Sequence, residues 1–350
     1  MKRLYGKTKN KKIKNIKKIF FWVFILVLLF AGCTKQEDKP TPFKLKVGTY
    51  NLWTSNSRKA LLTPPSSRYW SNSSTAMLSI IKDMNCDIFA FQEICDSIYG
   101  KKGKKTSLRY LMEQANLDYS WEIWSNIDGS YVTESSGKLS YSPGICYKTT
   151  VLELEQSGVF WLGGNPQKPE FLGFKPAHGD AKRACVWAKM RHKATNREFY
   201  FLSTHLELPA FNGVSDPQVH NENCKNLMEY ADEVIVWADM PAIICGDMNA
   251  TSTDQGYIQY LNNNNGRVHQ WFNAYEEASR KGVLGPLTKE NDATYNGTDG
   301  SWTATERLDH MFITGGTISS YETWRKKYPT ADGSLHFPSD HHPVVVTVEF

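Results

Sequence analysis

The chain has 350 residues and a formal net charge of +5, from 41 Lys and Arg against 36 Asp and Glu. Nine of the basic residues lie in the first 32 positions, which contain no acidic residue, so the remainder of the chain carries −4. This charge balance does not favour a nucleic-acid-binding protein, although a local basic patch could still bind phosphates. Residues 44–350 show no repeat and no Pro/Gly linker, and they are numerous enough to form one large core.

The N-terminal segment has the organisation of a signal peptide. Nine basic residues lie between positions 2 and 18, an apolar run extends from Ile19 to Ala31, and Gly32-Cys33 follows. A basic stretch, a short apolar stretch and small residues before a cysteine are typical of a secretory leader. The apolar run is shorter than the roughly 20 residues that a membrane-spanning helix needs. An uncleaved anchor is the alternative interpretation.

The end of this leader resembles a bacterial lipobox. Leu29-Phe30-Ala31-Gly32-Cys33 matches its pattern, with Phe30 where Leu is usual. The resemblance implies a signal peptide over residues 1–32, lipidation of Cys33, and a tether over residues 33–43. We therefore expect a lipoprotein of the cell envelope, held in the outer membrane of a Gram-negative bacterium, with exposure on the cell surface as a further option.

Strand-like and helical segments are interspersed along residues 44–350, which we predict to be one catalytic domain. The run 43–49 alternates apolar with polar residues, while 87–91 is continuously apolar and predicts a buried strand that stops at Gln92-Glu93. Further strands are predicted at 144–148, 184–190, 198–204, 242–245, 308–313 and 344–350, and helices at 77–84, 108–115 and 223–237. This arrangement predicts an α/β (α+β) protein.

Four of the six cysteines beyond Cys33 lie in or beside apolar strand-like runs. These four are Cys86, Cys146, Cys185 and Cys245. None of the cysteines shows the spacing of a zinc finger, and an envelope protein could pair some of them. We interpret the four as small buried hydrophobic residues.

Polar groups gather where the predicted strands end. They belong to Gln92-Glu93, Gly246-Asp247-Met248-Asn249, Leu308-Asp309 and Ser339-Asp340-His341-His342-Pro343. Carboxylates, an amide and an imidazole are what metal-assisted phosphoester hydrolysis needs, because a metal must neutralise the phosphoryl oxygens and a base must activate water.

Each of these groups has a predicted role. Glu93, Asn51 and Asp340 are candidate ligands of Mg²⁺, with Mn²⁺ as an alternative ion. Asp247 would position or deprotonate water, and Asn249 would donate to phosphate.

The remaining candidates are two imidazoles and a carboxylate. Asp309 would orient His341, as carboxylates orient catalytic imidazoles. His205, at the end of a predicted strand, supplies a second imidazole for the phosphoryl or leaving group.

Six short motifs together resemble the endonuclease/exonuclease/phosphatase superfamily, the deoxyribonuclease I-like group. They occur in family order between residues 51 and 343: Asn51-Leu52-Trp53, Phe91-Gln92-Glu93, Ser203-Thr204-His205-Leu206, Gly246-Asp247-Met248-Asn249, Arg307-Leu308-Asp309 and Ser339-Asp340-His341-His342-Pro343. The resemblance implies a four-layer sandwich of two packed mixed β-sheets flanked by helices. It also implies that His341, rather than His342, is catalytic.

A second resemblance, to the bacterial hydrolase and deadenylase-like branch of this superfamily, rests on residues 160–189. These include Phe160-Trp161-Leu162 and Asp180-Ala181-Lys182-Arg183. It implies that Arg183 lies against phosphate, which suits a guanidinium fork. The chain departs from the branch at 144–147, where an acidic residue is usual, and at His220-Asn221-Glu222-Asn223, where an Arg is usual.

The sequence therefore predicts an envelope-anchored, Mg²⁺-dependent phosphoesterase that uses an activated water molecule. Its substrate is a phosphodiester or a phosphomonoester, in a phosphorylated small molecule or a nucleic acid. A nuclease and a sphingomyelinase-like phosphodiesterase are the alternatives within this class, and a non-catalytic surface-binding lipoprotein is the alternative outside it. We expect a monomer that contacts the membrane through its lipid.

Overall fold

The structure is a computed structural model, and it describes residues 41–53, 70–95, 106–132, 139, 141–170, 182–211, 214–235, 240–297 and 305–350. Pro42–Phe350 form one structural unit. The predicted signal peptide, Cys33 and most of the tether lie outside the described residues. Within the described part of the chain, every helix is too short or too polar to cross a bilayer.

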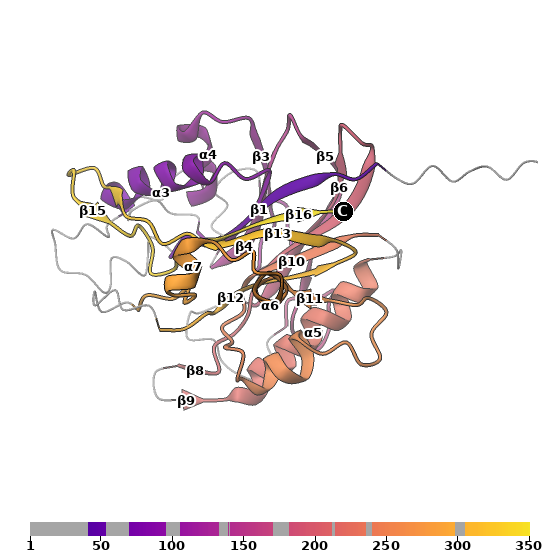
Figure 1. The fold of residues 1–350 in the computed structure, drawn as a ribbon. Helices are drawn as coiled ribbons and strands as arrows, with labels where there is room; N and C mark the ends of the chain where they lie inside the picture. The colour runs from indigo at the N-terminus through magenta and orange to yellow at the C-terminus, as the bar shows by residue number, and fades with distance from the viewer. Residues whose placement is uncertain are drawn as a thin grey trace, which may run out of the picture. The chain divides into compact units, whose positions relative to one another are not determined.

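Two mixed β-sheets form the centre of the unit (Figure 1). The first, in the order β13-β16-β1-β2-β4-β3, contains β1 (Lys44–Asn51), β2 (Ile88–Ile94), β3 (Tyr119–Ile123), β4 (Ser142–Lys148), β13 (Thr317–Thr323) and β16 (Val344–Glu349). The second, in the order β11-β12-β10-β7-β6-β5, contains β5 (Leu152–Trp161), β6 (Ala184–His192), β7 (Arg197–His205), β10 (Ala242–Asp247), β11 (Phe272–Asn273) and β12 (Asp309–Thr314). Two short hairpins pair β8 (Ala210–Phe211) with β9 (Val214–Ser215) and β14 (Tyr328–Pro329) with β15 (Leu335–His336).

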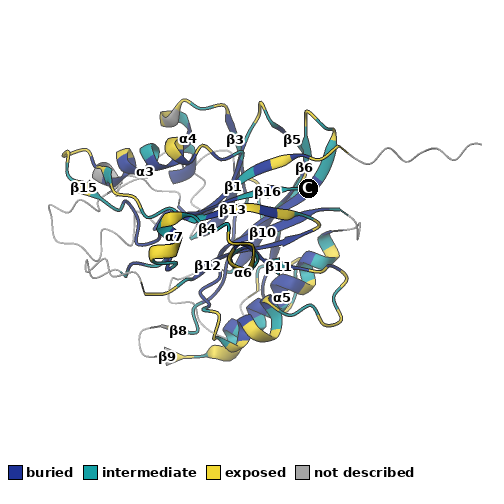
Figure 2. Ribbon diagram, viewed as in Figure 1, coloured by how far each residue is buried: buried dark blue, intermediate teal, exposed yellow. Residues whose placement is uncertain are grey.

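Helices flank the two sheets. They are α3 (Trp70–Met84), α4 (Ser107–Ala115), α5 (Pro217–Val234), the π-helix η1 (Tyr257–Leu261), α6 (Ala274–Lys281) and α7 (Pro286–Glu290). Apolar residues of α3 and α4 pack on the first sheet, and those of α5 and η1 pack on the second. A third apolar cluster, with residues from both sheets, fills the space between them, and Figure 2 shows most of the central strands in the colour of buried residues. The predicted fold class is confirmed.

Most predicted elements are present, with one informative difference. The strand predicted to stop at Gln92-Glu93 continues to Ile94 as β2. Its pairing with β4 is irregular between Phe91 and Ile94, and Glu93 has a positive φ of 58°. The chain therefore bulges where the sequence suggested an end, and such bulges commonly redirect a side chain. Cys86, Cys146, Cys185 and Cys245 are all buried free thiols, which confirms their interpretation as buried hydrophobic residues.

Strand direction brings the polar motifs to one edge. β1 runs parallel to β2, and β7 runs parallel to β10, so their carboxyl ends coincide within each sheet. β16 and β12 run antiparallel to β1 and β10, which places the residues at their starts at the same edges. The six motifs thus converge although they span almost the whole chain.

Gly246 allows β10 to approach β7 at this edge. It has a φ of 152°, and a Cβ added to it would lie 2.0 Å from the carbonyl oxygen of Thr204. Because that neighbour is backbone, it cannot yield without separating the two strands.

We predict that Gly246→Ala lowers the free energy of unfolding by about 3 kcal/mol, the upper range for overpacking a rigid site. Thermal and urea unfolding measure this. Gly164→Ala is the matched control, because nothing lies within 4 Å of a Cβ added there. Equal stability of the two variants would show that the β7–β10 contact does not require glycine.

Candidate active site

Asp247, at the end of β10, is the centre of a buried polar cluster between the two sheets. Its Oδ2 accepts a hydrogen bond from Asn51 Nδ2 at 2.9 Å. The same oxygen lies 3.4 Å from His205 Nε2 and 3.5 Å from His341 Nε2. Its Oδ1 accepts from the backbone N–H of Asn249 at 2.9 Å. One carboxylate oxygen thus faces three nitrogen donors from three different segments.

His341 lies between two carboxylates. Its Nδ1 donates to Asp309 Oδ2 at 2.7 Å, while its Nε2 points to Asp247. Asp309 pairs directly with Asp247 across β12 and β10, which fixes the distance between the carboxylates. The ring of Tyr295 packs against the imidazole, with 5.1 Å between centroids. Asp309 therefore sets the tautomer and the orientation of this imidazole.

The charges in this cluster follow from burial and proximity. Burial raises the pKa of Asp247 to about 6, although the charge of His341 acts against that rise. Burial lowers the pKa of His341, but Asp309 and Asp247 together outweigh it and hold that pKa well above its usual value. Near neutral pH the cluster consequently contains a carboxylate next to an imidazolium.

His342, the neighbour of His341, has a different environment. It is buried against Phe337, and its Nδ1 lies 3.4 Å from Asn296 Nδ2. Burial, followed by the charges of Arg325 and His341, lowers the pKa of His342 to about 3. The structure therefore places His341, and not His342, among the catalytic candidates.

The predicted metal ligands border this cluster. Asn51 Nδ2 lies 3.4 Å from Glu93 Oε1, and Glu93 is directed there by the bulge in β2. Ser339 Oγ donates to the carbonyl oxygen of Asn51 at 2.8 Å and lies 3.3 Å from Asp340 Oδ1. An amide and two carboxylates supply only oxygen ligands, and this donor set fits Mg²⁺.

A second group could also hold a metal. The ligand atoms of Asp247, Asp309 and His341 lie within 4.8 Å of one another. A metal needs a neutral imidazole, however, and both carboxylates favour the protonated form of His341. This group is better suited to proton transfer than to metal binding.

Asn249 and Arg183, the predicted phosphate-binding residues, lie on either side of the segment that follows β7. Asn249 adopts a positive φ of 46°, and its Nδ2 donates to the carbonyl oxygen of Leu206 at 2.8 Å. Among the described residues, this amide bonds through one N–H, so its other N–H can donate to a phosphoryl oxygen. Arg183 forms an ion pair with Glu207 at 2.9 Å.

Three polar residues of the site received no role from the sequence. Ser339 bridges Asn51 and the backbone N–H of His341. The hydroxyl of Thr294 accepts from the backbone N–H groups of Leu308 and Asp309. Glu207 contacts Arg183. Ser339 stood within a recognised motif, whereas Thr294 and Glu207 carried no signal that distinguishes them from ordinary polar residues.

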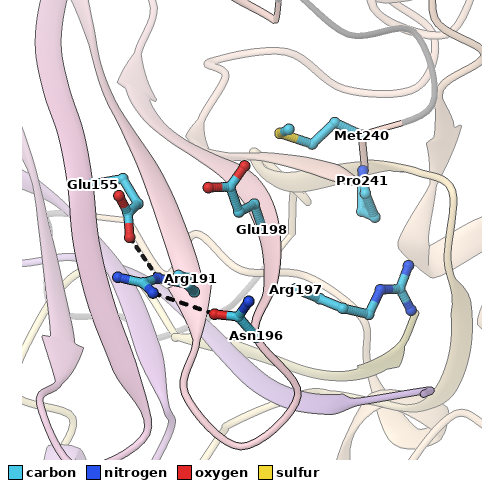
Figure 3. A pocket seen from close by; sticks show the side chains of 7 residues that line it. All are labelled: Glu155, Arg191, Asn196, Arg197, Glu198, Met240 and Pro241. Carbon is cyan, nitrogen blue, oxygen red and sulfur yellow. Dashed lines mark hydrogen bonds and ion pairs between the residues drawn. The ribbon is translucent and has the colours of Figure 1, made fainter. Parts of the chain in front are cut away.

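A surface pocket of about 580 Å³ lies away from these residues (Figure 3). It is lined by Glu155, Arg191, Arg197 and Pro241, among others, and Arg191 bonds to Glu155 within it. Arg197 begins β7, whereas His205 ends it. A nine-residue strand is roughly 25 Å long, so this pocket lies at the far end of the sheet from the catalytic candidates.

The chain matches the family model described as Endonuclease/Exonuclease/phosphatase family over residues 48–341. No curated protein matches it. Among solved structures, an endonuclease/exonuclease/phosphatase family protein from Bacteroides thetaiotaomicron is 23% identical, with a TM-score of 0.68 over 89% of this chain and 99% of that chain. The Bacteroides thetaiotaomicron mannosyl-6-phosphatase is 22% identical, with a TM-score of 0.66 over 87% and 100%.

A human structure is also similar. The Nocturnin catalytic domain with a bound sulfate anion is 16% identical, with a TM-score of 0.59 over 88% of this chain and 96% of that chain.

His310, which follows Asp309, is a neutral structural histidine. It is buried, with its Nε2 donating to the carbonyl oxygen of Ala250 at 2.7 Å and its Nδ1 facing Asn273 Nδ2 at 3.3 Å. The neutral ring satisfies both contacts. Burial, followed by the charge of Arg307, lowers the pKa of His310 to about 4.

We predict that His310 makes the protein less stable as the pH falls. Between its unfolded pKa of about 6.5 and its folded pKa of about 4, the unfolded state binds more protons, so the free energy of unfolding falls by ~3 kcal/mol as the pH drops through that window. Urea unfolding at pH 7.5, 6, 5 and 4 measures this loss. His310→Gln keeps a donor and an acceptor but cannot titrate, so it should show a shallower pH dependence. A variant with the same dependence as the wild type would assign the effect to other groups.

Proposed function

Since this chain belongs to the Endonuclease/Exonuclease/phosphatase family and is a hydrolase acting on phosphoester bonds, we propose that it is a Mg²⁺-dependent phosphoesterase attached to the cell envelope through Cys33. Its substrate is a phosphomonoester or phosphodiester of a small molecule. The observation that carries this proposal is the convergence of Asn51, His205 and His341 on one oxygen of Asp247. This arrangement has the donors and the base that hydrolysis needs in a preorganised form.

The residues divide into two groups in this proposal. Asn51, Glu93 and Asp340 would hold the divalent ion, with Mn²⁺ as an alternative. When bound, the ion neutralises phosphoryl oxygens and lowers the pKa of water.

Asp247 accepts a proton from the attacking water. Its pKa of about 6 leaves it ionised near neutral pH, yet basic enough to take that proton.

The imidazoles act as donors in this proposal. His341, held as an imidazolium by Asp309 and Asp247, donates a hydrogen bond or a proton to the phosphoryl or leaving-group oxygen. His205 and the free N–H of Asn249 supply further donors to the developing negative charge. No covalent intermediate with the enzyme is required, because the attacking group is water.

The charge of the chain favours a small substrate over nucleic acid. After removal of the basic leader, residues 33–350 carry −4, which repels a polyanion unless a local basic patch compensates. The likeness to a mannosyl-6-phosphatase supports the inclusion of sugar phosphates among the substrates to be assayed.

The test is a substrate panel with the full chain purified in detergent and supplied with Mg²⁺ or Mn²⁺. Bis-(p-nitrophenyl) phosphate, p-nitrophenyl phosphate, sugar phosphates, sphingomyelin, RNA and DNA cover the alternatives. Turnover that EDTA abolishes and Mg²⁺ restores is the expected result. Turnover of none of them with either ion would exclude the enzymatic proposal and leave a surface-binding lipoprotein, whereas preference for DNA or RNA would establish a nuclease.

We predict that Asp247→Asn and His341→Ala each reduce kcat by at least ~10²-fold, the lower scale for losing a general base or acid. Circular dichroism and thermal unfolding should show that both variants remain folded. Thr347→Ala in β16, whose side chain bonds to Ser320 on the adjacent strand, is a control for a polar substitution away from the site. Loss of activity in proportion to lost stability would argue for structural roles instead.

The proposed anchor gives a separate prediction. Cys33→Ala should move the protein from the membrane fraction to the soluble fraction and abolish incorporation of labelled fatty acid, while kcat stays within about two-fold of the wild type. Unchanged fractionation would contradict lipidation at Cys33. Because activity is measured in the same samples, this result is independent of the outcome for the active site.

A further inference from the structure

The ion pair between Arg183 and Glu207 lies beside the catalytic cluster. Arg183 immediately precedes β6, and Glu207 follows the last residue of β7 by two positions. Since β6 and β7 are antiparallel, both residues leave the sheet at the end that carries His205. The hydroxyl of Thr204 donates to the carbonyl oxygen of Ala184 at 3.1 Å, which holds the two chain segments together at this point.

The segment that carries Glu207 is joined directly to the catalytic turn. The backbone N–H of Leu206 donates to the carbonyl oxygen of Asp247 at 3.0 Å. The carbonyl oxygen of Leu206 in turn accepts from Asn249 Nδ2 at 2.8 Å. Glu207 therefore directly follows a residue whose N–H and carbonyl oxygen both bond to the catalytic turn.

Helix α5 fixes the backbone of Glu207 from the other direction. The backbone N–H of Glu207 donates to Asn223 Oδ1 at 3.2 Å, and the carbonyl oxygen of Glu207 accepts from His220 Nδ1 at 2.6 Å. The carboxylate accepts from the backbone N–H of Leu208 at 2.9 Å as well as from Arg183. The direction of the carboxylate is consequently determined before any substrate arrives.

The guanidinium of Arg183 retains donors for a second partner. Its side chain is 11% exposed and that of Glu207 is 9% exposed, so the pair is well shielded from solvent. Among the described residues, the bond to Glu207 uses Nη2 alone, which leaves Nε and Nη1 available. A planar guanidinium can hold a carboxylate at one edge and a phosphate at another.

We propose that Glu207 is a positioning residue that holds Arg183 so that its remaining N–H groups meet a terminal oxygen of the substrate phosphate. This inference rests on the proposed phosphoesterase function. A long Arg side chain loses considerable rotamer freedom when it binds, and a fixed carboxylate removes that freedom in advance. The alternative is that the pair only stabilises the fold, although a buried ion pair is often a weak source of stability.

Two substitutions of Glu207 separate orientation from charge. Glu207→Gln keeps an oxygen that accepts from Arg183 and Leu208, whereas Glu207→Ala removes the acceptor. Arg183→Ala and the double variant Arg183→Ala/Glu207→Ala complete a cycle. Glu222→Gln is the matched control, because Glu222 lies on α5 and pairs with Lys225 at the surface.

The full chain in detergent is assayed for kcat and KM on its best phosphoester, for thermal stability, and for the Kd of inorganic phosphate by calorimetry. Arg183→Ala and Glu207→Ala should each raise KM and the phosphate Kd about ten-fold, with a smaller change in kcat. Glu207→Gln should recover most of the phosphate affinity, and Glu222→Gln should equal the wild type. The double variant should be no weaker than Arg183→Ala, because Glu207 acts through Arg183.

Additive losses in the double variant would overturn the inference, since Glu207 would then act independently of Arg183. Lowered thermal stability with unchanged phosphate Kd would overturn it in favour of a purely structural pair. A wild type that hydrolyses no phosphoester would exclude the proposed function but not the inference about Glu207, because the affinity for phosphate still reports on Arg183. A wild type that binds no inorganic phosphate would overturn the inference itself.

Discussion

The hydrogen bond from Asn51 to Asp247 connects the two sheets at the edge where all the catalytic candidates gather. Asn51 ends β1 in the first sheet, and Asp247 ends β10 in the second. The bond from His341 to Asp309 makes the same connection a short distance away. The site therefore forms only when the two sheets are packed correctly. The relative position of the two sheets sets the distances between the catalytic candidates.

That constraint has an electrostatic consequence. Asp247, Asp309 and His341 are all buried, and isolated charges in such a place would be strongly unfavourable. They are tolerated because an imidazolium lies between two carboxylates and because the backbone N–H of Asn249 and the amide of Asn51 bond to the carboxylate of Asp247. A cluster held in this way does not need to reorganise when charge develops on a substrate, which is the condition for electrostatic catalysis.

The residues proposed to bind phosphate lie at the same edge of the second sheet. The backbone of Leu206 bonds to Asp247 and Asn249. The next residue, Glu207, forms an ion pair with Arg183. His220 of helix α5 bonds to the backbone carbonyl oxygen of Glu207. In the proposed arrangement, the substrate phosphate is bound through Arg183 and the residue that orients it. The pocket at the opposite end of the strands contributes nothing to this arrangement.

Local sequence patterns were sufficient to predict the main elements and the residues that gather at the site. Alternating and continuous apolar runs identified β1, β2, β10 and β16, and motifs at their ends identified the residues from Asn51 to His341, because local pattern depends only on neighbouring residues. Tertiary structure decided the rest. The bulge that turns Glu93, the support from Thr294 and the pairing of Arg183 with Glu207 all depend on contacts between residues far apart in the chain. No local pattern records such contacts, since only packing of the two sheets creates them.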